Sequence, residues 1–243
     1  MSTTWTATTT TSPVNSSDPR RFNYTLILTV LLTALLGSCL VLATPADASG
    51  TVTLRLRKAI STLPVKAHSH VTSYDRDADF GTWVTQHGAC DTRAVVLKTE
   101  SLKPTTQNSN CTVSKGRWYS FYNATYYYNA YGGTVQIDHV VPVENAWISG
   151  AWAWSHTTRV RYYNDLKDKR TLVAVDRSDN EAKGASDPSQ WMPSHGRCRY
   201  VRYWVAVKIR WHLHVSGAEK TKLASLAEGC ANTTLKITPA SVS

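Results

Sequence analysis

Residues 134–142 read TVQIDHVVP, and this stretch decides how the rest of the chain is interpreted. Val135 and Ile137 alternate with a polar glutamine, which is typical of a half-buried strand. Asp138 and His139 follow at the end of the strand, and a proline soon after stops strand pairing. The Asp-His pair places a hard oxygen ligand beside a proton acceptor, so it is the first candidate site in the chain.

The residues after this stretch predict a second strand and a short helix. Residues 172–175, LVAV, are apolar enough for a strand. In residues 176–184, DRSDNEAKG, aspartate and serine offer a helix N-cap and the final glycine offers a stop. The resulting order is strand, long loop, strand and short helix. Further helices are expected near residues 200–213 and 219–226, and residues 93–98 have the composition of another strand.

The whole chain is basic and rich in aromatic residues. Its 243 residues bound it to one domain, or to one domain with an appendage. The formal net charge of +10 favours a polyanionic partner, either nucleic acid or an anionic surface. The 9 tryptophans and 12 tyrosines can pack a core or stack on bases and sugars. Composition therefore indicates the class of binding partner, but it does not identify a reaction.

The start of the chain predicts export. A polar segment over residues 1–23 contains two arginines near its end, and an apolar run over residues 26–43 follows. Residues 46–48 then read ADA, a small-x-small cleavage signal. We expect residues 1–48 to be a signal peptide with an extended n-region, so that the mature protein is secreted and keeps its charge. The alternative is an uncleaved anchor, transiently associated with the membrane on its extracytoplasmic side, because the run is close to spanning length.

The number of cysteines also supports secretion into an oxidising compartment. Cleavage removes Cys39 and leaves Cys90, Cys111, Cys198 and Cys230, an even number in an exported chain. Three connectivities are possible for two disulfides. The pairs Cys90–Cys111 and Cys198–Cys230 are favoured because each closes a short loop within one part of the chain. A metal cluster is the less expected use, since the cysteines lack CxxC spacing.

Several ordered motifs together carry a family resemblance. They read IDHVVP at residues 137–142, AWISGA at 146–151, NDL at 164–166, NEAK at 180–183 and DPSQWMP at 187–193. In this order they resemble the HNH nuclease family in its D-H-x-x-P … N-D-L … N-x-x-K form. The resemblance is closest to the secreted HNH-type proteins of actinobacteria.

The resemblance implies an α+β fold with a ββα-metal core, flanking helices and a small extra sheet. It covers roughly residues 90–230. We therefore expect a nuclease domain at residues 86–232, preceded by a lead-in at 49–85 and followed by a tail at 233–243.

The resemblance also implies roles for four side chains. His139 corresponds to the general base, and Asp138 to the acid that holds a divalent metal. Asn180 matches the position on the helix that also binds the metal. Asn164 matches the middle asparagine, which ties down the loop and orients the histidine. An amide oxygen is a harder ligand than imidazole, so Mg²⁺ or Mn²⁺ is expected rather than Zn²⁺.

Residue chemistry leads to the same reaction. Phosphodiester hydrolysis needs an activated water and charge neutralisation, which a histidine and a bound cation can supply. Arg159, Arg161 and Lys183 are candidates to hold flanking phosphates, with a solvated basic face as the equal alternative. The expected function is a metal-dependent endonuclease acting on DNA, with RNA as a second candidate, little sequence preference and no small-molecule cofactor. The alternative is a non-catalytic exported protein that binds nucleic acid or a cell-wall polymer.

Overall fold

Strand β7 (Val135–His139) pairs antiparallel with β8 (Leu172–Asp176), and helix α6 (Arg177–Lys183) begins directly after β8. The computed structural model describes residues 50–242, which all belong to one compact unit. The expected signal peptide, residues 1–48, lies outside the described residues. The predicted order of strand, long connection, strand and short helix is confirmed.

The β7–β8 pair lies between two hydrophobic cores. Every residue of β8 is buried, which explains its unbroken apolar run. Leu172 and Ala174 pack with Ile137 in the smaller core, whereas Val173 and Val175 pack in the larger one. The residues at the end of β7 are therefore held by packing on both sides of the pair.

The long connection between these strands is mostly helical. It contains α4 (Val143–Ile148), the 3₁₀ turn η3 (Ala151–Ala153) and α5 (His156–Tyr163). Gly150 ends α4 with a φ of 125°, a conformation that favours glycine. The Tyr162 hydroxyl donates to the Val141 carbonyl, so the end of α5 returns to the end of β7.

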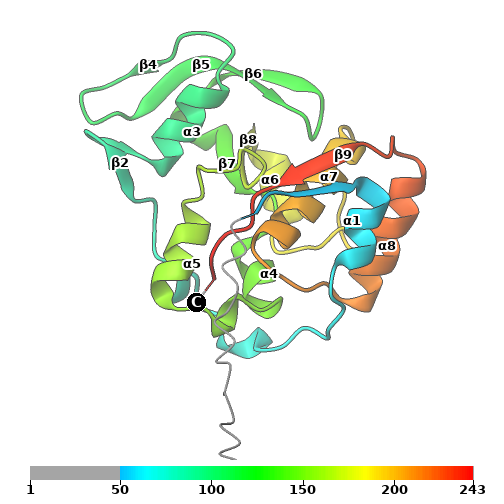
Figure 1. Ribbon diagram of the computed structural model, residues 1–243. Coiled ribbons are helices and arrows are strands. Elements are labelled where there is room, and N and C mark those ends of the chain that lie inside the picture. The colour runs from blue at the N-terminus through cyan, green and yellow to red at the C-terminus, as the bar shows by residue number, and fades with distance from the viewer. Residues whose placement is uncertain (1–49, 243) are drawn as a thin grey trace, which may run out of the picture. The chain divides into compact units, whose positions relative to one another are not determined.

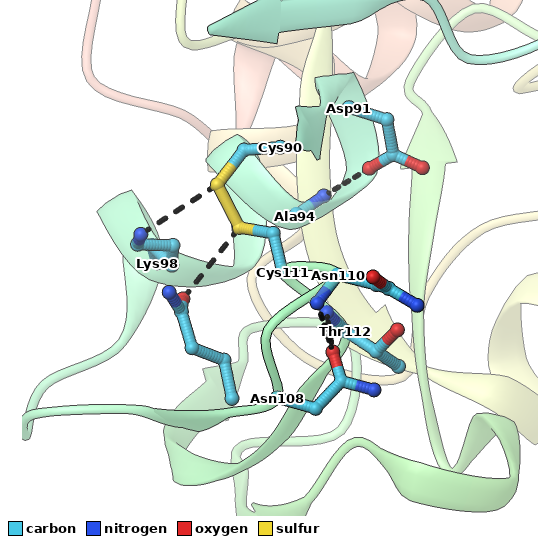
Figure 2. The surroundings of a disulfide bond; sticks show 9 residues. Cys90, Asp91, Ala94, Lys98, Asn108, Asn110, Cys111 and Thr112 are labelled. Atoms are coloured by element: carbon cyan, nitrogen blue, oxygen red, sulfur yellow. Dashed lines mark hydrogen bonds between the residues drawn. A yellow bond between two sulfur atoms is a disulfide. The ribbon is translucent and has the colours of Figure 1, made fainter. Parts of the chain in front are cut away.

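The expected strand over residues 93–98 is wrong, because these residues lie in helix α3 (Thr92–Glu100). Asp91 caps this helix by accepting a hydrogen bond from the Ala94 backbone N–H at 2.7 Å, as Figure 2 shows. The disulfide Cys90–Cys111 joins the residues just before α3 to the loop between residues 107 and 113, which connects two strands of the neighbouring sheet (Figure 2). The cap and the disulfide fix a helix where the valine-rich composition alone favours a strand.

The small extra sheet expected from the sequence is present beside α3 (Figure 1). Its strands are β4 (Thr106–Gln107), β5 (Val113–Ser120) and β6 (Thr125–Asn129), in that order. Before α3, the short strands β2 (Thr85–His87) and β3 (Cys90–Asp91) pair with each other. After β6, the turn η2 (Tyr131–Gly133) leads into β7.

The lead-in and the C-terminal segment pack against each other. Strand β1 (Val52–Arg55) pairs with β9 (Thr234–Ile237), and α1 (Leu56–Thr62) follows β1. Helix α1 lies beside α8 (Gly217–Glu228) and also contacts α7 (Arg197–Arg210), as Figure 1 shows. The helices expected near residues 200–213 and 219–226 are thus confirmed as α7 and α8.

The second disulfide, Cys198–Cys230, joins the start of α7 to the residues after α8. The favoured pairing of all four cysteines is therefore confirmed. The turn η1 (Val71–Ser73) and helix α2 (Arg76–Phe80) complete the lead-in. Over residues 50–242, none of the helices combines the length and the apolar character needed to cross a membrane.

Candidate active site

A pocket of about 380 Å³ lies at the end of β7. Asp138 and His139 line it from β7, Asn180 and Lys183 line it from α6, and Glu144 lines it from α4. The fold therefore brings two distant sequence motifs to one cavity, because α6 follows the strand that pairs with β7.

His139 is held in one orientation and one tautomer. Its side chain is buried, and its Nε2 atom lies 2.8 Å from the Tyr163 carbonyl oxygen, to which it donates a proton. The Trp83 indole stacks on the imidazole with an interplanar angle of 3°. Nδ1 then carries the free lone pair, and it has no hydrogen bond to any part of the chain that the structure describes.

The electrostatics of this position keep His139 neutral. Burial, the largest effect, lowers the pKa of His139 to about 3, and the charges of Arg76 and Lys183 act in the same direction. The hydrogen bond to the Tyr163 carbonyl opposes this shift of the pKa. A neutral imidazole that lines a polar pocket and has one nitrogen without a hydrogen bond can accept a proton from a water molecule.

Asn164 does not touch the His139 ring; it fixes the two groups that do. Its Oδ1 accepts hydrogen bonds from the Val84 N–H at 3.0 Å and the Thr92 hydroxyl at 2.6 Å. Its Nδ2 donates to the Thr82 carbonyl at 3.2 Å and to the Val160 carbonyl of α5 at 3.0 Å. Asn164 directly follows Tyr163 in the chain. Its hydrogen bonds therefore hold the loop that carries Trp83 close to Tyr163.

Both oxygens of Asp138 already have partners. Oδ1 lies 2.9 Å from the Lys183 Nζ, and Oδ2 accepts a hydrogen bond from the Tyr122 hydroxyl at 2.5 Å. Burial raises the pKa of Asp138, and the charge of Lys183 lowers it. Each carboxylate oxygen has two lone pairs, so Asp138 can still offer one to a cation at the pocket.

Two further oxygen donors face the same pocket. Asn180 donates its Nδ2 to the Gln136 Oε1 at 2.7 Å, which leaves its amide oxygen as the group available to a cation. Glu144 is partly exposed, and its carboxylate has no hydrogen bond or ion pair within residues 50–242. Residue type alone did not favour Glu144, because a lone glutamate in the first turn of a helix is usually solvated.

The three predicted phosphate ligands lie elsewhere or are already paired. Lys183 is 1% exposed and donates to the His139 carbonyl at 3.2 Å as well as to Asp138, so it is not part of a basic face. The Arg159 guanidinium donates to the carbonyls of Asp79 and Trp154, and neither it nor Arg161 lines the pocket. Arg161 donates to the Ser241 carbonyl at 3.1 Å.

A second cation, Arg76 from the lead-in, lines the pocket together with Lys183. Its Nη2 donates to the Tyr163 hydroxyl at 3.0 Å, and its guanidinium lies over the Tyr163 ring. Sequence reasoning missed Arg76 because no motif surrounds it and because it lies far along the chain from β7. Only the tertiary fold brings it beside His139.

Comparison with known proteins supports the family resemblance. Residues 78–226 match the model of the GmrSD restriction endonucleases, C-terminal domain. The chain is also similar to a protein of Arthroderma benhamiae named "Uncharacterized secreted protein", with 36% identity over 203 residues. That alignment covers 81% of this chain and 97% of the relative. No solved structure matches the chain significantly.

Proposed function

We propose that this chain, which belongs to the family of GmrSD restriction endonuclease C-terminal domains, is an exported metal-dependent endonuclease that hydrolyses DNA, with RNA as a second substrate. One observation carries the proposal. The pocket at the end of β7 holds a neutral histidine, oriented through Nε2 and free at Nδ1, beside the oxygen donors Asp138 and Asn180.

His139 acts as the general base. Its Nδ1 takes the proton of the attacking water, and the Tyr163 carbonyl then stabilises the imidazolium through the hydrogen bond to Nε2. Asn164 and Trp83 are positioning residues, since they hold Tyr163 and the imidazole in place. Arg76 is the cation suited to the phosphate, because its guanidinium is fixed by Tyr163 at the edge of the same pocket.

The donors in the pocket suit a hard divalent cation. Carboxylate and amide oxygens from Asp138, Asn180 and Glu144 line one cavity, and such oxygens are the ligands that Mg²⁺ and Mn²⁺ prefer. When bound, the metal supplies neutralisation of the phosphate and of the leaving oxygen. Lys183 would share Asp138 with such a cation. When no metal is bound, the positive charge of Lys183 compensates the negative charge of Asp138.

Export and a polyanionic substrate are supported by independent features. The Arthroderma benhamiae relative is named as a secreted protein, and two disulfides suit an oxidising compartment. The net charge of +10 favours association with nucleic acid. A groove beside Tyr203 is lined by Lys167, Lys169 and Lys236 and by the Arg170–Asp168 ion pair, so part of this charge gathers at one place.

A plasmid-cleavage assay on the purified, disulfide-bonded protein tests the proposal. We expect nicking and linearisation of supercoiled DNA with Mg²⁺ or Mn²⁺, and none with EDTA. The variant His139→Ala should lose about 10²–10⁴-fold in rate, the typical contribution of a general base. Its thermal unfolding, metal binding and DNA binding should stay near those of the parent protein.

His156→Ala is the matched control, because His156 is exposed on α5 and does not line the pocket. It should cleave at the parent rate. Absence of cleavage with Mg²⁺, Mn²⁺, Ca²⁺ and Zn²⁺ would favour the non-catalytic binding protein instead. Near-full activity of His139→Ala would show that the general base is another residue.

A further inference from the structure

A second cluster of ligand-type side chains lies outside the pocket. It comprises His68 from the loop between α1 and η1, Asp187 from the loop after α6, and Glu219 from the first turn of α8. One nitrogen or oxygen atom from each residue lies within 4.8 Å of the other two. Asp187 is 4% exposed and Glu219 is fully buried, so these charges are removed from water. A buried pair of carboxylates needs compensation by positive charge.

Hydrogen bonds leave part of this cluster without partners. The Glu219 Oε1 accepts from the Trp204 indole at 2.6 Å, and its Oε2 accepts from the Ser216 N–H at 3.3 Å and lies 3.9 Å from the His68 Nε2. That separation is too long for a hydrogen bond. The His68 Nε2 is shielded from solvent and has no other hydrogen-bond partner in the described chain. Asp187 accepts from Ser189 through Oδ1 alone, which leaves Oδ2 for another ligand.

A neighbouring histidine repeats this pattern. His214 is 7% exposed, and its Nδ1 is also shielded without a hydrogen-bond partner among residues 50–242. Its ring centroid lies 6.3 Å from that of His68.

The charge of the cluster leaves room for a divalent cation. The Lys208 ammonium lies 3.3 Å from Glu219 and donates to Asn145, Ser149 and the His214 carbonyl. It compensates one of the two carboxylates, so one negative charge remains beside the unpaired His68 nitrogen. Imidazole nitrogen and carboxylate oxygen are both ligand types that bind Zn²⁺.

We propose that His68, Asp187 and Glu219 bind a Zn²⁺ ion at a site distinct from the pocket at β7. Zinc ligands lie about 2.0–2.2 Å from the ion, so the three side chains close slightly around it, with water as the fourth ligand. The site joins the lead-in to α8 and to the loop after α6. Because the chain runs from His68 through η1 to Arg76, the bound ion also fixes the segment that brings Arg76 to the pocket.

Metal analysis of the secreted, disulfide-bonded protein tests this site. After chelator treatment and titration with Zn²⁺, the parent protein should bind one more equivalent per chain than His68→Ala, measured by mass spectrometry of the metal. Zn²⁺ should raise the Tm of the parent and not that of His68→Ala. Asp187→Asn is the second variant, since the amide keeps the acceptor for Ser189 while removing the charge. It should also lose the added equivalent.

Two controls separate this site from others. His87→Ala removes an exposed histidine on β2, and it should keep the full Zn²⁺ equivalent and the full rise in Tm. His139→Ala should also keep both, so a failure of the nuclease proposal leaves this test intact. Equal Zn²⁺ binding by the parent and His68→Ala, or no rise in the Tm of the parent, would overturn the proposal.

Discussion

Two buried lysine–carboxylate pairs in this protein differ in what surrounds them. Lys183 lies 2.9 Å from Asp138, with side-chain exposures of 1% and 4%. Lys208 lies 3.3 Å from Glu219, and neither side chain is exposed. Burial lowers the pKa of each lysine and raises that of each carboxyl, while the partner's charge opposes both shifts.

The surroundings decide what each pair can do. Asp138 and Lys183 line the pocket, so a cation can approach the carboxylate without unfolding the protein. Lys208 is enclosed by side-chain and backbone acceptors, and its exchange for another cation requires local rearrangement. A buried ion pair contributes little net stability, but removal of one partner leaves an uncompensated charge. The comparison therefore predicts a functional role for the pair at the pocket and a structural role for the enclosed pair.

Replacement of each lysine gives the largest expected difference. Lys208→Met should lower the free energy of unfolding by about 3–5 kcal/mol, because Glu219 then remains buried with less compensation. Lys183→Met should cost less, since Mg²⁺ or Mn²⁺ can compensate Asp138 from the pocket, and added metal should restore much of the loss. Urea unfolding of both variants with and without Mn²⁺ measures this. Equal losses that do not respond to metal would contradict the distinction.

The aromatic donors to the carboxylates provide a smaller test. Tyr122→Phe removes the hydroxyl that donates to Asp138 and should cost about 1.5–3 kcal/mol, the range for a hydrogen bond to a charged group. Tyr200→Phe is a matched control, because Tyr200 is equally buried and its hydroxyl has no hydrogen-bond partner in the described residues. Urea unfolding should place Tyr200→Phe within a few tenths of the parent or above it. Similar losses for both variants would show that packing of the ring, not the hydrogen bond, dominates.

The sequence predicted local features better than long-range ones. The β7–β8–α6 order followed from apolar runs and from the cap at Asp176, and loop closure suggested the disulfide pairing. Helix α3 was missed because its valines have β propensity, whereas the Asp91 cap and tertiary packing determine the helix. Local sequence patterns predict a secondary-structure element correctly only when residues close in the sequence determine that element.

The candidate site shows the same limit. The motifs located His139, Asp138 and Asn180 together, because they lie on elements adjacent in the fold. Arg76 was invisible to sequence reasoning, since its position depends on the packing of the lead-in against α5. Lys183 was identified as a relevant residue but as a phosphate ligand, because the sequence does not reveal that its side chain turns inward to Asp138.

Glu100 is a partly buried carboxyl that lacks a lysine partner, and it extends the comparison. Its Oε2 accepts a hydrogen bond from the Ala174 N–H at 2.7 Å, and it forms no ion pair within residues 50–242. Burial raises the pKa of Glu100 from 4.5 to about 7, against smaller opposing effects of the Ala174 hydrogen bond and the charges of Arg199 and Lys169. Without an ion-pair partner, this carboxyl gains its proton near neutral pH in the folded protein.

This shift predicts how stability depends on pH. The folded protein binds the Glu100 proton more tightly than the unfolded chain, so its contribution is present below pH 4.5 and is lost as pH rises to about 7. The loss should stay below about 3 kcal/mol, because the side chain is partly exposed.

Glu100→Gln keeps an acceptor for Ala174 without a titrating proton, and it should be more stable than the parent at pH 8 and similar at pH 4. Urea unfolding from pH 4 to pH 8 measures the free energy of unfolding of both proteins. The difference between Glu100→Gln and the parent removes the effects of the other titrating groups, because these are the same in both. Glu228→Gln, on an exposed side chain, is the control and should follow the parent. A constant difference between Glu100→Gln and the parent at every pH would show that Glu100 titrates normally.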